Sequence, residues 1–114
     1  MLKVMAFLVK KQGLDTGDLI DCYETRHVPL ILSLAPAPTT YRRNYLRRDA
    51  TTSGPDDCDI VTELVFPDRA AYQNWVSTMY APGSGVADDE MTFLDRTRTR
   101  SYVVEEHATD NQSR

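Results

Sequence analysis

Two ionisable side chains stand where acid–base chemistry is easiest to support. His27 ends an amphipathic segment just before Pro29, and an imidazole can accept or donate a proton near neutral pH without special tuning. Glu63 interrupts the otherwise apolar run 60–66. A carboxyl group that faces a dry cavity holds its proton to a higher pH and can then serve as a general acid or base. His27 and Glu63 are therefore the candidate catalytic residues.

Both residues also have a purely structural interpretation. His27 could cap the free carbonyl groups at the end of its helix without touching a substrate. Glu63 could pair with one of the nearby arginines across a hairpin, as an interior ion pair without a catalytic role. The sequence leaves both alternatives open.

A group of side chains that could hold a ligand accompanies these two. Tyr23 lies one helical turn before His27, so the two share a helix face. Arg43 stands between two tyrosines in a strand-forming segment, and its planar guanidinium suits a two-point grip on a carboxylate. Aromatic residues also occupy an apolar helical stripe and flank the Pro-Gly-Ser-Gly break at 82–85. Core packing and simple surface exposure are the alternatives. The candidate binding residues are Tyr23, Tyr41, Arg43, Tyr45, Trp75, Tyr80 and Phe93.

Several classes of protein are disfavoured by composition and motif content. The net charge of −4 argues against nucleic acid as a partner, and no apolar run reaches the about 20 residues of a membrane span. Two histidines and two cysteines lack metal-ligand spacing, and Asp88 and Asp89 are typical of a helix start. No glycine-rich phosphate motif is present. We expect no metal and no cofactor, and, since the first residues lead straight into a strand, a cytoplasmic protein.

The elements that must position these side chains follow from periodicity. Strands are predicted at 3–10, 39–47, 60–66 and 97–105. Helices are predicted from 14 to 34 (with a disturbance at Pro29), from 67 onward and at 88–95. This βαββαβ order indicates an α+β, ferredoxin-like domain over 1–106, with one antiparallel sheet and its helices on one face, followed by a polar tail over 107–114.

The uncovered face of such a sheet is the main structural consequence. Both faces of the first strand are apolar, and the strand at 60–66 is apolar on both sides except for Glu63. A face of this kind left in water would form a large hydrophobic patch. Face-to-face packing of two copies would bury it, so we expect a homodimer with a cavity that takes a small molecule.

Five segments resemble the EthD family of dimeric α+β barrels: the first strand with the turn closed by Gly13, residues 23–30 with the His-Val-Pro-Leu element, 41–45, 61–64, and 93–106 with its Phe-Leu-Asp-Arg start. The resemblance covers about residues 2–106 and implies a ferredoxin-like homodimer. Similar proteins include small decarboxylases of aromatic polyketide pathways, a lactone isomerase and an accessory protein of an ether-degrading cytochrome P450 system. The scaffold therefore hosts several chemistries.

The expected function combines the residues with this resemblance. It is a cofactor-independent enzyme that moves protons on an aromatic or polyketide-like carbonyl or carboxylate compound, in a decarboxylation, isomerisation, dehydration or cyclisation. The alternative is a non-catalytic protein that binds a small molecule or supports an oxygenase pathway.

Overall fold

The computed structural model describes residues 1–47 and 58–110, and within them four strands and five helical segments follow one another along the chain. The elements are β1 (Leu2–Leu8), α1 (Thr16–Cys22), η1 (Tyr23–His27), α2 (Val28–Leu34), β2 (Thr40–Tyr45), β3 (Ile60–Phe66), α3 (Arg69–Met79), α4 (Val86–Phe93) and β4 (Arg100–Val104).

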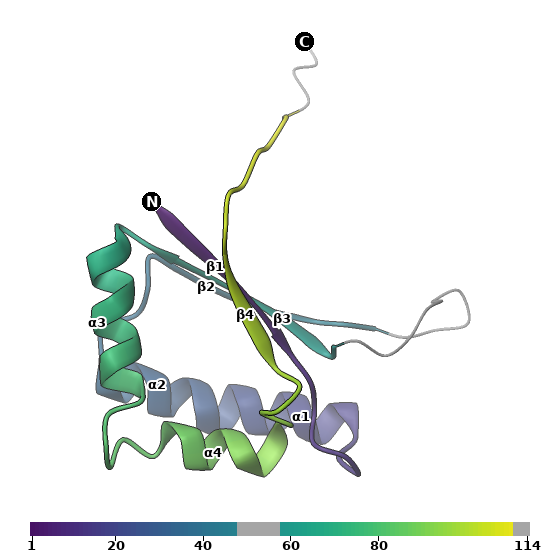
Figure 1. The fold of residues 1–114 in the computed structure, drawn as a ribbon. Coiled ribbons are helices and arrows are strands. Elements are labelled where there is room, and N and C mark those ends of the chain that lie inside the picture. The colour runs from purple at the N-terminus through teal and green to yellow at the C-terminus, as the bar shows by residue number, and fades with distance from the viewer. Residues whose placement is uncertain (48–57, 111–114) are drawn as a thin grey trace.

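The strands form one antiparallel sheet in the order β2-β3-β1-β4. The helices lie on one face of this sheet, as Figure 1 shows. This arrangement confirms the predicted α+β, ferredoxin-like fold with helices on a single face. The aromatic stripe of α3 and Phe93 of α4 face the sheet, because these apolar surfaces leave water by packing against it, whereas Val86 of α4 packs between helices against Ile31 and Met79.

Strict alternation along β3 separates the two faces of the sheet. Ile60, Thr62, Leu64 and Phe66 are buried beneath the helices, whereas the intervening side chains are only partly buried. The register pairs Glu63 with Met5 on β1. Glu63 therefore lies on the face that no helix covers, because neighbouring residues of a strand point to opposite faces.

A single widened turn lets the first helix continue past Pro29. The backbone N–H of Val28 bonds to the carbonyl of Tyr23, five residues earlier, which makes η1 a π-helical turn. Proline has no N–H and its ring would crowd the preceding carbonyls, and a π turn relieves that conflict. The predicted disturbance at Pro29 is thus confined to η1. The helix then runs to Leu34 and ends at the Ala-Pro-Ala-Pro segment.

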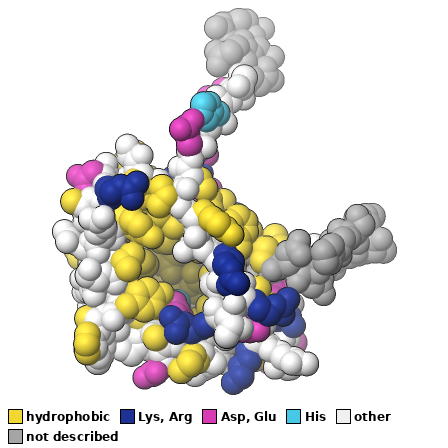
Figure 2. Space-filling model, viewed as in Figure 1, with side chains coloured by type: hydrophobic (Ala, Val, Ile, Leu, Met, Phe, Trp, Pro, Cys, Tyr) yellow, Lys and Arg dark blue, Asp and Glu magenta, His cyan; other side chains and the backbone are white. Residues whose placement is uncertain are grey.

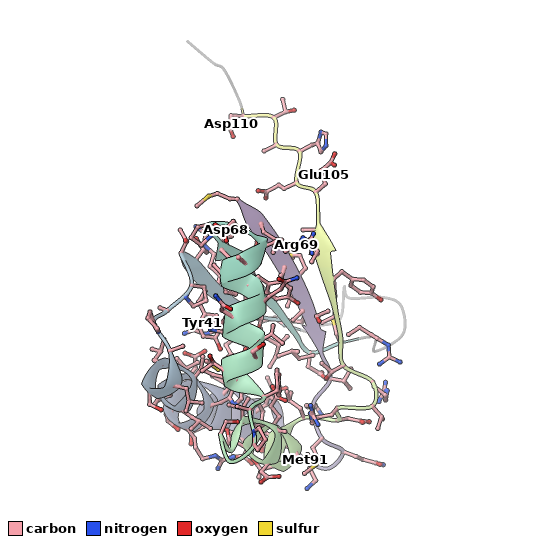
Figure 3. All side chains as sticks on the ribbon, turned by 60° about the vertical axis from the view of Figure 1, so that its left-hand side comes forward. Tyr41, Asp68, Arg69, Met91, Glu105 and Asp110 are labelled. Atoms are coloured by element: carbon pink, nitrogen blue, oxygen red, sulfur yellow. The ribbon has the colours of Figure 1, made fainter. Side chains whose placement is uncertain are left out.

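Side-chain caps fix where two helices begin. The carboxylate of Asp15 accepts a hydrogen bond from the backbone N–H of Asp18, and that of Asp68 accepts one from Ala71. Figure 3 shows Asp68 and Arg69 at the start of α3. Helix α4 begins at Val86, before the predicted 88, because Gly85 adopts the positive φ that ends the preceding turn.

The chain after β4 leaves the body of the protein. Residues 105–110 are exposed and have no regular secondary structure, and Glu105 and Asp110 lie away from the sheet in Figure 3. The remainder of the expected tail, 111–114, lies outside the described residues.

Candidate functional site

A cavity of about 300 Å³ lies between the helix-facing side of the sheet and the helices η1, α3 and α4. Figure 2 shows the hollow, with apolar side chains around it and charged side chains at its edge. The aromatic, polar and charged residues that line it are Tyr23, His27, Tyr41, Thr62, Tyr72, Trp75, Tyr80, Glu90, Arg96, Thr99 and Ser101. The π turn contributes two of them, Tyr23 and His27.

His27 is held in one orientation at the wall of this cavity. It is 4% exposed, and its Nδ1 lies 2.9 Å from Oδ2 of Asp89. An ionised carboxylate can only accept, so the ring donates its Nδ1 proton to Asp89. The rings of Tyr23 and Phe93 both pack edge-on against the imidazole ring, with centroids 5.3 Å and 5.1 Å from that of His27. Nε2 is therefore the nitrogen left for a ligand.

Asp89 owes its own position to a second partner. Arg26 Nε lies 2.7 Å from the other carboxylate oxygen, Oδ1, and Arg26 also bonds to Thr92. The Asp89 side chain is 12% exposed and does not line the cavity. Its role toward a ligand is thus indirect, through the imidazole that it orients.

A second carboxylate faces the other side of the imidazole. Glu90 Oε2 lies 3.8 Å from His27 Nε2 and accepts a 2.9 Å hydrogen bond from the Tyr80 hydroxyl. Its other oxygen accepts from Arg96 Nε at 3.1 Å. Burial, together with the charge of Glu90, raises the pKa of Tyr80, so this hydroxyl stays protonated as a donor. His27, Tyr80, Glu90 and Arg96 form one polar wall.

Three hydroxyl groups of the cavity lining form a chain beside His27. The Tyr41 hydroxyl donates to that of Tyr23 at 3.3 Å, and the Tyr23 hydroxyl lies 3.0 Å from Oγ1 of Thr62. Burial raises the pKa of both tyrosines. Their protons are therefore retained at any ordinary pH.

Glu63 lies apart from this cavity. Its carboxylate pairs with Lys3 Nζ at 2.9 Å on the uncovered face and accepts from Asn44. The hydrogen bond from Lys3 lowers the pKa of Glu63, the direction opposite to that expected for a carboxyl group in a dry cavity. Glu63 thus has an ion-pair partner, as its structural interpretation required, but the partner is Lys3 of β1 and not an arginine across the hairpin. The structure does not bring Glu63 and His27 together.

Arg43 and Tyr45 are engaged with a carboxylate from η1. Arg43 donates two hydrogen bonds to Glu24, at 3.0 and 2.8 Å, and Tyr45 donates to the same group. The Arg43 guanidinium also lies over the Tyr41 ring, 4.8 Å from its centroid. Neither Arg43 nor Tyr45 lines the cavity. In this structure Arg43 grips a carboxylate of the protein itself.

This cluster gives a pH-dependent prediction. Arg43 holds the pKa of Glu24 below its ordinary 4.5, so the stabilisation is complete above that value and is lost as pH falls through the lower folded pKa. We expect Glu24→Gln to lower the free energy of unfolding by about 1 kcal/mol at neutral pH, a modest amount because solvent screens a carboxylate that is 33% exposed. Urea denaturation of both proteins across the acid range measures this. A difference that persists undiminished at the lowest pH would contradict it.

Of the nine candidate residues, five line the cavity: Tyr23, His27, Tyr41, Trp75 and Tyr80. Phe93 lies behind the wall, fully buried against His27 and Tyr23. The sequence did not lead to the polar and charged residues Thr62, Asp89, Glu90 and Arg96, nor to the further lining residues Tyr72, Thr99 and Ser101. Thr62 is the inward neighbour of Glu63 in an alternating strand, and this parity was the available signal. The contacts of Asp89 and Glu90 with His27 depend on the packing of α4 against η1.

Metal and membrane features are absent from what the structure describes. Among residues 1–47 and 58–110, no three His, Cys, Asp or Glu side chains gather as a metal site requires. No helix in the described ranges is long and apolar enough to cross a membrane.

The fold and the histidine site define a ferredoxin-like α+β domain with a helix-side cavity. The family model of the EthD domain matches residues 11–97, and the chain belongs to this family. A crystal structure of an EthD family protein from Bacillus halodurans is similar with a TM-score of 0.65 at 17% identity, covering 94% of this chain and all of that one. An Arabidopsis thaliana protein is similar with a TM-score of 0.65 at 10% identity, covering 97% of this chain and all of that one. At these identities the likeness shows the fold alone. No curated protein matches the chain.

Proposed function

We propose that this protein is a cofactor-independent enzyme in which His27 transfers a proton on a small carbonyl compound. One observation carries the proposal: a buried imidazole lines a cavity, and its Nδ1 is committed to Asp89 while Nε2 remains for a ligand. Histidine is the side chain best suited to proton transfer near neutral pH. A structural cap would need helix carbonyl groups as partners, whereas Nδ1 of His27 bonds to the carboxylate of Asp89, and Nε2 lies 3.8 Å from that of Glu90, beyond hydrogen-bond distance.

The proposed chemistry begins at a C–H bond next to a carbonyl group. Nε2 takes the proton, and the bonding electrons move onto the carbonyl oxygen to give an enolate. The imidazolium then lies between the carboxylates of Asp89 and Glu90, which stabilise its positive charge. Return of the proton to a different atom completes an isomerisation. The same group would protonate the carbanion left by a decarboxylation.

The cavity limits the size of the substrate. Its volume of about 300 Å³ lies at the lower end of the roughly 300–1,000 Å³ range of small-molecule sites. Aromatic rings from Tyr72, Trp75 and Tyr80 line it. We therefore propose a substrate with a single ring, flat enough to pack against these side chains.

A panel of single-ring compounds tests this proposal. Aryl ketones, cyclic β-keto acids and unsaturated lactones are incubated with the protein in heavy water, with binding followed by calorimetry and conversion by mass spectrometry. We expect at least one member that binds to gain deuterium at the carbon next to its carbonyl group or to form product. Binding without exchange or product would favour a non-catalytic carrier, and a panel in which nothing binds would contradict the substrate class.

We also propose that two copies associate through the uncovered face of the sheet. Apolar side chains of three strands share this face with one ion pair. Lys3 and Glu63 neutralise each other at 2.9 Å, and the exposed Arg42 and Arg100 lie opposite Glu63 and Phe7 on the two edge strands, where their long side chains can reach solvent at the rim of an interface. Tyr102 remains 55% exposed and packs edge-on against Phe7. By register the face comprises Lys3, Met5, Phe7, Thr40, Arg42, Asn44, Val61, Glu63, Val65, Arg100, Tyr102 and Val104.

The substitution Phe7→Glu tests the dimer. It puts a charged carboxylate in place of an apolar ring on the proposed interface, where loss of hydration opposes association, so we expect dimer dissociation to become at least about a hundredfold more favourable. Leu32→Glu is the matched control, because Leu32 is 47% exposed on α2, away from this face. Sedimentation equilibrium should show a dimer for the wild type and the control, and a monomer for Phe7→Glu. A wild-type protein that is monomeric throughout would overturn the proposal.

A further inference from the structure

The hydroxyl chain of Tyr41, Tyr23 and Thr62 has one more hydroxyl proton than it has hydrogen bonds. Three hydroxyl protons share two hydrogen bonds: one from Tyr41 to Tyr23, and one between Tyr23 and Thr62 in either direction. Within 1–47 and 58–110 these three hydroxyl groups make no further hydrogen bond. Since Tyr41 donates to Tyr23, the remaining proton belongs to either Tyr23 or Thr62.

This remaining donor lies at the cavity rather than in solvent. Tyr23 is 3% exposed and Thr62 is 2% exposed, and both line the cavity. A buried hydroxyl donor that lacks an acceptor is costly unless something binds to it. The two residues come from different elements, η1 and β3, so the donor position is fixed by the packing of helix on sheet.

We propose that the Tyr23–Thr62 pair is the binding site for a ligand oxygen that carries or develops negative charge, such as an enolate or a phenolate oxygen. This inference rests on the proposed function and names its substrate class more closely: a single-ring compound whose oxygen meets the hydroxyl chain while its acidic hydrogen meets His27. Fixed hydroxyl donors in a site shielded from water stabilise a developing oxyanion strongly. The raised pKa values of Tyr23 and Tyr41 keep both groups protonated as donors.

Thr99 provides a matched control on the same cavity wall. Its hydroxyl donates to the backbone carbonyl of Asp95 at 3.1 Å and accepts from the N–H of Val9 at 3.4 Å. Its proton is therefore already used. Thr62→Val and Thr99→Val each replace a cavity hydroxyl with a methyl group. Only Thr62→Val removes a member of the Tyr41–Tyr23–Thr62 chain, which has the unused proton.

Two probes that differ in a single oxygen test the proposal. Para-nitrophenolate carries the anionic oxygen, and para-nitrotoluene has a methyl group in its place. Thr62→Val should weaken binding of the phenolate by about 10- to 100-fold, since hydrogen bonds to a charged group are among the stronger ones, and leave nitrotoluene within about threefold. Thr99→Val should leave the affinities for both probes unchanged. Tyr41→Phe should cause a smaller loss, because it removes a polarising donor and leaves the Tyr23–Thr62 pair.

The measurement distinguishes this inference from the proposed function. It records binding of a probe that is not turned over, so a preference for the phenolate can be found even if His27 proves inactive. Thr62→Ser, compared with Thr62→Ala, repeats the test if the valine variant does not fold, and serine should restore the preference. Equal weakening of both probes, or no weakening of either, would overturn the oxyanion site while leaving the role of His27 untouched.

Discussion

Replacement of His27 by asparagine should lower turnover of any substrate found for this protein by at least about a hundredfold. The asparagine side-chain NH₂ can donate to Asp89 where Nδ1 now does, so the contact of η1 with α4 is kept. An amide cannot take up a proton near neutral pH, so the acid–base step is lost. We expect a cost in stability of only about 1–2 kcal/mol, from the lost ring contacts with Tyr23 and Phe93.

His107→Asn is the control for this variant. His107 lies in the exposed segment after β4, with its side chain 80% exposed, and pairs only with the neighbouring Glu105. Steady-state rates and thermal melts of both variants beside the wild type separate a chemical effect from unfolding. If His27→Asn turns over substrate at the wild-type rate while folded, the imidazole is a structural residue.

Loss of the orienting carboxylate should be the next largest effect. In Asp89→Asn one oxygen must serve both His27 and Arg26, whereas Asp89 now offers each an oxygen of its own. Nδ1 then loses a charged acceptor, and Nε2 is no longer fixed as the free nitrogen. We expect kcat to fall by about 10- to 100-fold, with KM within about twofold, because Asp89 does not line the cavity.

The neighbouring residue supplies the comparison. Asp88 is exposed in the same first turn of α4, so Asp88→Asn changes the same helix end without touching His27. It should leave kcat unchanged. A rise in KM for Asp89→Asn with kcat unchanged would show that Asp89 contributes to substrate binding instead of to turnover. Equal effects of Asp89→Asn and Asp88→Asn would show that α4 responds only to charge at its N-terminus.

The fold could be predicted from the sequence because it depends on local patterns. The order of the elements followed from apolar periodicity, and the first helix, predicted from residue 14, begins at Thr16 after the cap of Asp15. Strand ends were predicted too far outward, as at 97–105 against the observed β4 at Arg100–Val104. Residues 97 and 98 instead belong to a turn, in which the backbone N–H of Arg98 bonds to the carbonyl of Asp95 and that of Thr97 to its carboxylate, both at 3.2 Å.

The site was only partly predictable, because it is assembled from distant segments. His27 and Tyr23 were found from their spacing on one helix. Glu63 was selected because a charge in an apolar strand is unusual, yet the pairing of β1 with β3 gives it Lys3 as a partner on the uncovered face. The carboxylates that do meet His27 are 62 and 63 residues away in the chain, and no local pattern indicates that contact.

The central claim is that His27 moves a proton on a ligand held in the cavity. Its most direct test is the rate of deuterium incorporation into the tightest-binding ketone of the panel in heavy water, followed by proton NMR with equal amounts of wild-type protein and of His27→Asn. We predict an exchange rate well above that in buffer with the wild type. After subtraction of the buffer rate, the rate with the variant should be lower than the wild-type rate by at least about a hundredfold. Equal exchange rates in the two samples would contradict the account.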